Sequence, residues 1–446
     1  MKLYSEGKNY KLYGGSMLDM LEVIEPCTID SIVTDPPYEL GFMNKGWDAS
    51  GVAFQPDTWA KCLEVLKPGG YLLAFGGTRT YHRIACAIED AGFEIRDTIM
   101  WLYGQGFPKS MNISKGIEAK ETYGKASTEY KRIVEQSGDG EEYTVMQTNN
   151  GCIGETHEAT RKVYEPQSEI AKRWDGWGTC LKPAYEPVIV ARKPCEGSCV
   201  DNVLKYGVGG INIDECKIGT DTITTHAKSK DDSWFGMIGE CPESEHVGRF
   251  PSNVILTYGD DDFDEVCGGM PYTSSSASGY NFDRSSQDNV THLYTNIKSG
   301  MHFADEGSAS RYFYCAKASA RDRDEGCEHL EDQSMSMMAN GKGTLMIGAA
   351  SLKGEHKEVQ PKKNIHPTVK PCELMQYLVR LVTPKGGTVL DPFNGSGSTG
   401  KATMYENRDR QAKYKYIGIE LTPEYLPIAD ARIRFVENRP VQFKLF

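Results

Sequence analysis

Two stretches of the chain alternate short apolar runs with helix-like segments, and this alternation constrains the fold most. In the first stretch the apolar runs Ile29–Thr34, Tyr71–Phe75 and Phe93–Leu102 are separated by helical patterns over Asp57–Lys67 and Thr78–Ala91. Strands that alternate with helices of this length predict a parallel sheet with right-handed crossovers. The pattern therefore predicts an α/β fold.

The alternation stops after about residue 104 and returns near the other end of the chain. There a helical pattern over Cys372–Val382 precedes strand patterns at Thr388–Leu390 and Tyr416–Ile419. Between the two stretches the sequence is polar and rich in glycine, serine and aspartate, with one strand pattern at Pro187–Arg192 and short β-like pieces at Asn253–Tyr258 and Arg311–Ala316. So much irregular sequence favours an inserted recognition module, or loops that order on a partner.

Charge and cysteine content exclude several classes of protein. The net charge of −12 argues against a purely electrostatic nucleic-acid binder. The first residues lack the apolar core of a signal peptide, and no run is long enough to span a membrane. The 13 cysteines are scattered singly, and the closest pair, Cys195 and Cys199, has no second pair at zinc-site spacing. We expect a soluble, cytoplasmic protein with reduced thiols, no metal site and no membrane partner.

The first candidate site is the tetrapeptide Asp35-Pro36-Pro37-Tyr38, which follows the apolar run Ile29–Thr34 directly. Ligands of open α/β sheets bind outside the carboxyl ends of the strands, so a carboxylate and an aromatic ring at this position favour a role in chemistry. The alternative from these residues alone is a proline-rich turn after a strand.

The second candidate site is the glycine-rich turn Asp391-Pro392-Phe393-Asn394-Gly395-Ser396-Gly397, which follows the predicted strand Thr388–Leu390. Gly395 and Gly397 let the backbone approach a ligand closely, and the next helix offers free N–H groups. Glu420 ends the following predicted strand, at a position from which a carboxylate can hold ribose hydroxyls. Together these residues predict a site for a nucleoside cofactor.

These two motifs, with His366-Pro367-Thr368-Val369-Lys370-Pro371, resemble the S-adenosylmethionine-dependent DNA amino-methyltransferases. The catalytic tetrapeptide comes first and the glycine motif last, which is similar to the β class of that family, and the likeness covers most of the chain. The resemblance implies an α/β, Rossmann-like methyltransferase sheet with an inserted DNA-recognition region. It also implies cofactor-binding roles for eight residues: Asp391, Phe393, Gly395, Gly397 and Glu420 around S-adenosylmethionine, and Thr368, Lys370 and Thr399 near its methionine end.

The resemblance fits the chemistry of amine methylation. The Asp35 carboxylate and the Pro36 carbonyl can accept the two N–H groups of an exocyclic amine, and Pro37 stiffens the turn that aims them. Tyr38 offers a face on which an extruded base can stack. One position departs from the family pattern: members often have a Gly-Asp pair near the N-terminus, whereas this chain has Gly15-Ser16. We expect Ser16 to weaken cofactor binding or to leave the task to Asp35.

The resemblance implies five segments. Residues 1–105 form the catalytic half of the methyltransferase domain, 106–179 an insertion, 180–200 a return strand, 201–365 the target-recognition region, and 366–446 the cofactor-binding half. The predicted activity is site-specific methylation of adenine N6 in double-stranded DNA, as in restriction-modification systems.

Three alternatives stay open from the sequence. A cytosine-N4 DNA methyltransferase usually has Ser-Pro-Pro-Tyr in place of Asp-Pro-Pro-Tyr. An RNA or protein amine methyltransferase typically places the glycine motif before the tetrapeptide. A non-catalytic DNA-binding module could keep the fold without the reaction. Whether the protein forms a homodimer or works with a partner restriction nuclease is also open.

Overall fold

The computed structural model describes residues 2–22, 24–40, 46–103, 110–124, 142–148, 156–162, 164–225, 244–258, 272–274, 306–317, 321–331 and 363–440. The chain divides into two compact units. The larger contains Met1–Leu102 and Glu186–Phe446, and the smaller contains Tyr103–Tyr185. In the described ranges no helix is both long and apolar enough to cross a membrane.

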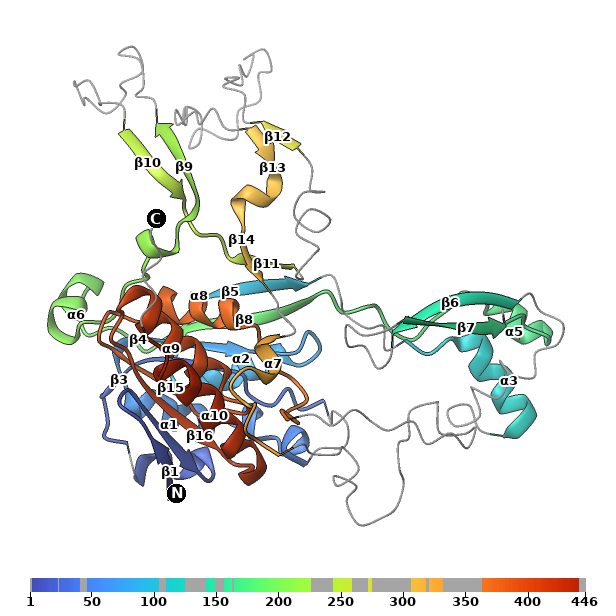
Figure 1. The fold of residues 1–446 in the computed structure, drawn as a ribbon, viewed down its shortest axis with the longest axis horizontal. Coiled ribbons are helices and arrows are strands. Elements are labelled where there is room, and N and C mark those ends of the chain that lie inside the picture. The colour runs from blue at the N-terminus through green and yellow to red at the C-terminus, as the bar shows by residue number, and fades with distance from the viewer. Residues whose placement is uncertain are drawn as a thin grey trace, which may run out of the picture. The chain divides into compact units, whose positions relative to one another are not determined.

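The larger unit is built on one ten-stranded sheet (Figure 1). Its strands, in spatial order, are β1 (Lys2–Glu6), β2 (Tyr10–Gly14), β16 (Lys415–Glu420), β15 (Thr388–Asp391), β3 (Ile29–Thr34), β4 (Leu66–Phe75), β8 (Tyr185–Arg192), β5 (Glu94–Tyr103), β11 (Val254–Tyr258) and β14 (Tyr314–Lys317). The central run from β2 to β4 is parallel throughout. The carboxyl ends of these strands therefore meet at one edge of the sheet, and both candidate motifs follow strands of this run.

Strand β8 breaks the parallel pattern. The sequence predicted a strand here and a parallel sheet, but β8 pairs antiparallel with β4, with Val188 opposite Phe75. The chain reaches β8 through the smaller unit rather than through a helical crossover, so nothing forces a parallel return. As a consequence the amino end of β8 lies at the edge where β3 and β4 have their carboxyl ends.

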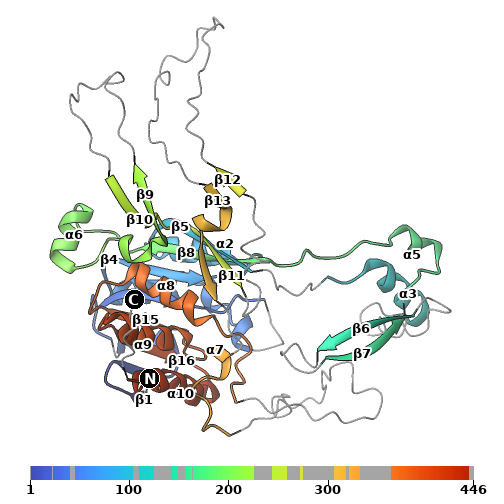
Figure 2. The ribbon, with the colours of Figure 1, turned by 45° about the horizontal axis from the view of Figure 1, so that its top comes forward.

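Helices cover both faces of the sheet. Helices α8 (Cys372–Val382), α9 (Ser398–Arg410) and α10 (Leu426–Glu437) lie side by side, as Figures 1 and 2 both show. Helices α1 (Pro56–Val65) and α2 (Tyr81–Asp90) pack together in a separate apolar core with the sheet. Trp59, Ile84, Ile32 and Leu390 are fully buried in that core. Short 3₁₀ turns lie at 17–22, 46–49, 52–54, 214–216, 309–312 and 423–425.

The remaining elements of the larger unit come between β8 and α8 in the sequence. They are α6 (Cys199–Tyr206), the hairpin of β9 (Ile218–Thr225) and β10 (Ser244–Arg249), the pair β12 (Tyr272–Ser274) and β13 (Glu306–Ser308), and α7 (Arg321–Asp324). Strands β11 and β14 correspond to the short β-like pieces of the sequence, and they pair in parallel at the edge of the main sheet. Part of the expected recognition region is thus continuous with the central sheet.

The smaller unit combines two helices with a hairpin. Helix α3 (Ile113–Tyr123) packs against α5 (Glu169–Arg173), and β6 (Glu142–Thr148) pairs antiparallel with β7 (Thr156–Lys162). The side chains of Asn112 and Ser168 cap the two helices by accepting hydrogen bonds from backbone N–H groups of their first turns.

Most expected elements of the larger unit agree with the structure, but one predicted helix boundary was wrong. The sequence predicted a helix to Lys67, but the helix ends at Val65, and Lys67 and the following Pro68-Gly69-Gly70 lie inside β4. The proline disfavours helical backbone at Lys67, and pairing with β3 already begins at Leu66. Glycines that resembled a turn are therefore part of an irregular strand.

Candidate active site

The tetrapeptide Asp35–Tyr38 leaves the carboxyl end of β3 without regular secondary structure. Pro36 and Pro37 are buried, whereas Asp35 and Tyr38 are half-buried. The Tyr38 hydroxyl lies 2.9 Å from Asp35 Oδ1. The aromatic ring thus folds back beside the carboxylate that begins the motif.

Lys370 joins this group from the segment that precedes α8. Its Nζ lies 2.6 Å from Asp35 Oδ2 and 3.2 Å from Tyr38 Oη, and the ammonium lies 4.9 Å from the centre of the Phe75 ring. Burial alone would lower the pKa of Lys370, but the carboxylates of Asp35 and Glu186 raise it above its ordinary value. The sequence predicted Lys370 at the cofactor, and the structure places it against the tetrapeptide.

Glu186 is a member of the site that sequence reasoning missed. Its Oε2 lies 2.9 Å from Tyr38 Oη and 3.4 Å from Lys370 Nζ. It stands near the start of β8, and the antiparallel direction of that strand brings it to the edge where the tetrapeptide lies. The sequence signal was a carboxylate directly before the predicted strand Pro187–Arg192.

The glycine motif lies directly beside the tetrapeptide because β15 is the parallel neighbour of β3. Thr34, the last residue of β3, donates a hydrogen bond of 2.6 Å to Asp391 Oδ1, although the two residues are 357 positions apart. Burial raises the pKa of Asp391 to about 7, against hydrogen bonds from Thr34 and the Phe393 backbone that lower it. The two motifs predicted from sequence therefore meet at one edge of the sheet.

The glycine turn has the close packing that its residues predicted. Gly395 has a φ of 52°, and a Cβ there would lie 2.8 Å from His366 Nε2. Its N–H donates to Glu420 Oε2 at 2.6 Å, and Thr422 N–H donates to the other carboxylate oxygen at 2.7 Å. Burial raises the pKa of Glu420 above its ordinary value. Gly397 also has a left-handed φ, of 75°.

The other predicted cofactor residues lie near these two motifs. Thr399, in the first turn of α9, is buried and donates to the Val33 carbonyl at 3.3 Å. Phe393 is half-buried and its ring centre lies 6.2 Å from that of Trp59. Thr368 is exposed, and its carbonyl accepts a 2.6 Å hydrogen bond from His366 Nδ1.

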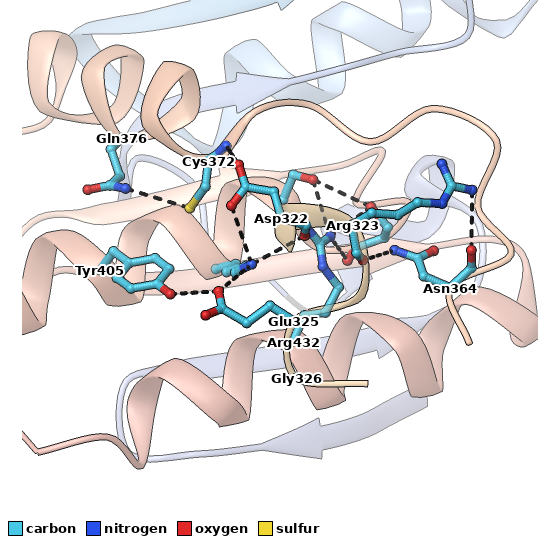
Figure 3. Close-up of polar contacts among 12 residues, drawn as sticks. Asp322, Arg323, Glu325, Gly326, Asn364, Cys372, Gln376, Tyr405 and Arg432 are labelled. Atoms are coloured by element: carbon cyan, nitrogen blue, oxygen red, sulfur yellow. Dashed lines mark hydrogen bonds and ion pairs between the residues drawn. The ribbon is translucent and has the colours of Figure 1, made fainter. Parts of the chain in front are cut away.

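A network of buried charges contacts the glycine turn, and the sequence did not predict it. Figure 3 shows part of this network, with Asp322, Glu325 and Arg432. The fully buried Arg432 donates to the Ser396 carbonyl at 2.6 Å and to the Asp322 carbonyl at 3.0 Å. Lys401, also fully buried, lies 2.9 Å from Glu325 Oε2. These contacts connect the segment Asp322–Glu325 to α9 and α10, and Arg432 also binds Ser396 of the glycine turn.

Comparison with known families identifies the family to which this chain belongs. The sequence profile of the DNA methylase family, whose members methylate N6 or N4 amines, matches residues 29–431. The chain belongs to the DNA methylase family. Members of this family use S-adenosylmethionine as the methyl donor.

Individual DNA methylases match this chain over shorter stretches. The type II methyltransferase M.XycI of Xanthomonas campestris pv. cyanopsidis is 40% identical over 75 residues, which cover 17% of this chain and 23% of that protein. M2.DpnII of Streptococcus pneumoniae is 33% identical over 115 residues, covering 26% of this chain and 40% of that protein. The matches thus span less than half the length of these relatives.

Solved structures of DNA methylases align over most of the chain at low similarity. The PvuII cytosine-N4-specific DNA methyltransferase is 13% identical with a TM-score of 0.41, covering 98% of this chain and 94% of that one. The M1.HpyAVI complex with S-adenosylmethionine is 14% identical with a TM-score of 0.34, covering 95% of this chain and 99% of that one. Similarity at this level adds nothing to the family assignment.

The residues around the glycine turn fit the cofactor of this family. A Cβ at Gly395 would lie 2.8 Å from His366 Nε2, so only glycine lets the backbone of the turn pack this closely against His366. The Glu420 carboxylate receives two backbone hydrogen bonds, and a carboxylate has about four lone-pair sites, so it can also accept from ribose hydroxyls. The N-terminus of α9 has no side-chain cap.

The departure at Ser16 lies beside this turn. The Gly15 N–H donates to the Glu420 carbonyl at 2.9 Å, and the Ser16 hydroxyl accepts from the Leu18 N–H at 3.2 Å. Ser16 therefore opens the 3₁₀ turn Met17–Glu22 next to the end of β16. The expectation that Ser16 weakens cofactor binding or leaves the task to Asp35 stays a prediction.

The described ranges contain no group of three or more His, Cys, Asp or Glu residues that could hold a metal ion. The closest cysteines, Cys195 and Cys199, have their sulfur atoms 4.0 Å apart.

Proposed function

We propose that this protein transfers a methyl group from S-adenosylmethionine to the N6 amine of adenine in double-stranded DNA. The observation that carries the proposal is the hydrogen bond between Thr34 and Asp391. It joins the end of the strand that carries Asp35 to the start of the glycine motif. An amine held at Asp35 and a cofactor held at the glycine turn would then be neighbours, and placement supplies much of the rate in such reactions.

The tetrapeptide supplies acceptors for the amine. The amine of adenine is a poor nucleophile because its lone pair is delocalised into the ring. Asp35 and the Pro36 carbonyl each accept one of its N–H groups and draw the nitrogen toward tetrahedral geometry. Asp35 contacts Lys370 through one oxygen and Tyr38 through the other, which leaves about two lone-pair sites for the amine.

Lys370 and Tyr38 prepare this site for an extruded base. The ammonium of Lys370 lies 2.6 Å from Asp35 Oδ2, and a carboxylate that pairs with a cation accepts hydrogen bonds but does not donate. The hydroxyl contacts of Tyr38 to Asp35 and Glu186 fix the position of its ring. A base turned out of the duplex can stack on that ring.

S-adenosylmethionine, when bound, supplies an electrophilic methyl group on a sulfonium. We assign Glu420 to the ribose hydroxyls, and Gly395 and Gly397 to the close backbone approach. Asp391 and Phe393 lie at the same turn and complete this part of the cofactor site. We assign Thr368, Lys370 and Thr399 to the methionine end of the cofactor. That end has to approach Asp35, and Lys370 already contacts Asp35.

DNA recognition falls to the region 201–365 in this proposal. Its lysines and arginines would contact phosphates, so that binding weakens with salt although the chain carries a net charge of −12. The choice of adenine over cytosine rests on Asp35, because cytosine-N4 enzymes usually have serine at this position.

Transfer of labelled methyl groups from S-adenosylmethionine tests the proposal. Purified protein should label duplex DNA, and RNA should not accept the label. Asp35→Ala should abolish labelling while calorimetry still detects cofactor binding, because Asp35 is not among the residues assigned to the cofactor. Labelling of RNA in place of duplex DNA would contradict the proposal, as would full activity of Asp35→Ala.

A further inference from the structure

One hydroxyl group stands between two carboxylates at the proposed active site. Tyr38 Oη lies 2.9 Å from Asp35 Oδ1 and 2.9 Å from Glu186 Oε2. Both contacts have hydrogen-bond length, and both oxygens belong to groups that only accept when ionised. The proposed function uses Asp35 and the ring of Tyr38 but gives Glu186 no task.

The number of protons in this group is informative. The Tyr38 hydroxyl has a single hydrogen, and Lys370 Nζ, at 3.2 Å, donates to its oxygen rather than accepting from it. With both carboxylates ionised, Tyr38 can donate to only one of them, and the second contact brings two oxygens together without a hydrogen. One additional proton, carried by either carboxylate, completes a continuous chain from Asp35 through Tyr38 to Glu186.

The methylation reaction produces such a proton. The exocyclic nitrogen starts with two hydrogens, gains a methyl group and keeps one hydrogen, so one N–H bond has to break and its electron pair stays on nitrogen. Asp35 accepts hydrogen bonds from this amine in the proposed function, and it is therefore the first oxygen that the proton meets.

We propose that Asp35, Tyr38 and Glu186 form a proton relay that carries this proton away from the methylated amine. An O–H bond forms on Asp35 as the N–H bond breaks. The Asp35 proton then passes to Tyr38 Oη while the original Tyr38 hydrogen passes to Glu186 Oε2, so that Tyr38 is unchanged and Asp35 is ionised again. Glu186 acts through Tyr38 and does not touch the base. The inference rests on the proposed function.

Two features of the surroundings suit a relay. Lys370 Nζ lies 2.6 Å from Asp35 Oδ2 and 3.4 Å from Glu186 Oε2, so one fixed cation faces whichever carboxylate is ionised. The Asp35 side chain is 23% exposed, and a base held in contact with its carboxylate would cover part of that exposed surface. Glu186 lies on β8, beyond Tyr38, and its side chain is 22% exposed, which gives the proton a way to solvent.

Glu186→Gln tests the relay because the amide oxygen still accepts from Tyr38 and Lys370 but cannot take up the proton. We expect the single-turnover rate of adenine methylation to fall about 100-fold, the lower end of what positioned proton transfer contributes. Tyr38→Phe keeps the ring and should lose a similar factor, and the double variant should be no slower than the slower single variant. The rate of the wild-type protein should vary non-linearly with the deuterium fraction of the solvent because two protons move together, and both variants should give a straight line.

Asp430→Asn is the matched control. Asp430 on α10 accepts a 2.6 Å hydrogen bond from Tyr10 on β2. The change therefore also replaces a carboxylate that contacts a tyrosine by an amide, but at a different place in the fold. It should keep the wild-type rate and the non-linear isotope dependence. Cofactor affinity and unfolding should stay near wild type in Glu186→Gln.

The outcomes separate the relay from the proposed function. A wild-type protein that methylates no DNA contradicts the proposed function and the relay together. A wild-type protein that methylates adenine, with Glu186→Gln equally fast and equally non-linear in deuterium, contradicts the relay alone. A slow Glu186→Gln that has also lost cofactor affinity or stability shows a structural role for Glu186 and overturns the relay.

Discussion

Replacing Lys370 with methionine removes a buried cation that faces two carboxylates. The Lys370 side chain is 7% exposed, and Asp35 and Glu186 are 23% and 22% exposed, so solvent screens the group weakly. At an effective dielectric constant of about 20, unit charges 2.6 Å apart attract by about 6 kcal/mol, most of which offsets desolvation. Losing the cation of such a buried group costs about 3–5 kcal/mol, because both carboxylates then stay buried without a positive partner. We expect the free energy of unfolding to fall by this amount.

Urea unfolding at neutral pH measures the change, and the chain offers a close control. Lys205 forms an ion pair of the same 2.6 Å length with Glu196, but these side chains are 62% and 53% exposed. Lys205→Met should leave stability near wild type because solvent screens an exposed pair. Adding Glu186→Gln to Lys370→Met should recover part of the loss, since it removes one of the unpaired charges. A Lys370→Met protein as stable as Lys205→Met would refute the reasoning.

Three further predictions concern the glycine turn. Burial raises the pKa of Asp391 to about 7, so the unfolded chain releases this proton first as pH rises. In urea unfolding between pH 5 and 8, the unfolding free energy of wild type should therefore fall by about 3 kcal/mol relative to that of Asp391→Asn. Burial lowers the pKa of His366 to about 4, so the unfolded chain binds this proton first as pH falls. Between pH 7 and 5 the unfolding free energy of wild type should therefore fall by about 2 kcal/mol relative to that of His366→Asn. For both residues, a variant with the same pH dependence as wild type would contradict the assignment. Gly395→Ala should weaken cofactor binding in calorimetry by about tenfold or more, because its Cβ would meet His366 at 2.8 Å in left-handed backbone, whereas Gly51→Ala, equally left-handed but with open space around it, should bind normally.

Local patterns were sufficient to predict the central elements of the fold. The run Ile29–Thr34 is β3 and the pattern Cys372–Val382 is α8, with the same bounds in the structure. A short stretch rich in β-branched residues favours a strand, and a helix with one apolar face has a clear period, so neither signal depends on distant residues. The glycine turn and the acidic end of β16 followed from spacing in the same way.

Contacts between distant parts of the chain could not be predicted from these patterns. Glu186 reaches Tyr38 across 148 positions, and it does so only because β8 runs antiparallel to β4. The α7 segment contacts Arg432 across 110 positions through a backbone carbonyl, which no side-chain pattern reveals. The sequence therefore identified the tetrapeptide and the glycine turn but not the groups that hold them in place.

The central claim is that Asp35 and the residues around it methylate the N6 amine of adenine. Mass spectrometry of nucleosides from duplex DNA, incubated with the purified protein and S-adenosylmethionine, tests this directly. The account predicts N6-methyladenine that depends on both the protein and Asp35. N4-methylcytosine without N6-methyladenine would contradict it.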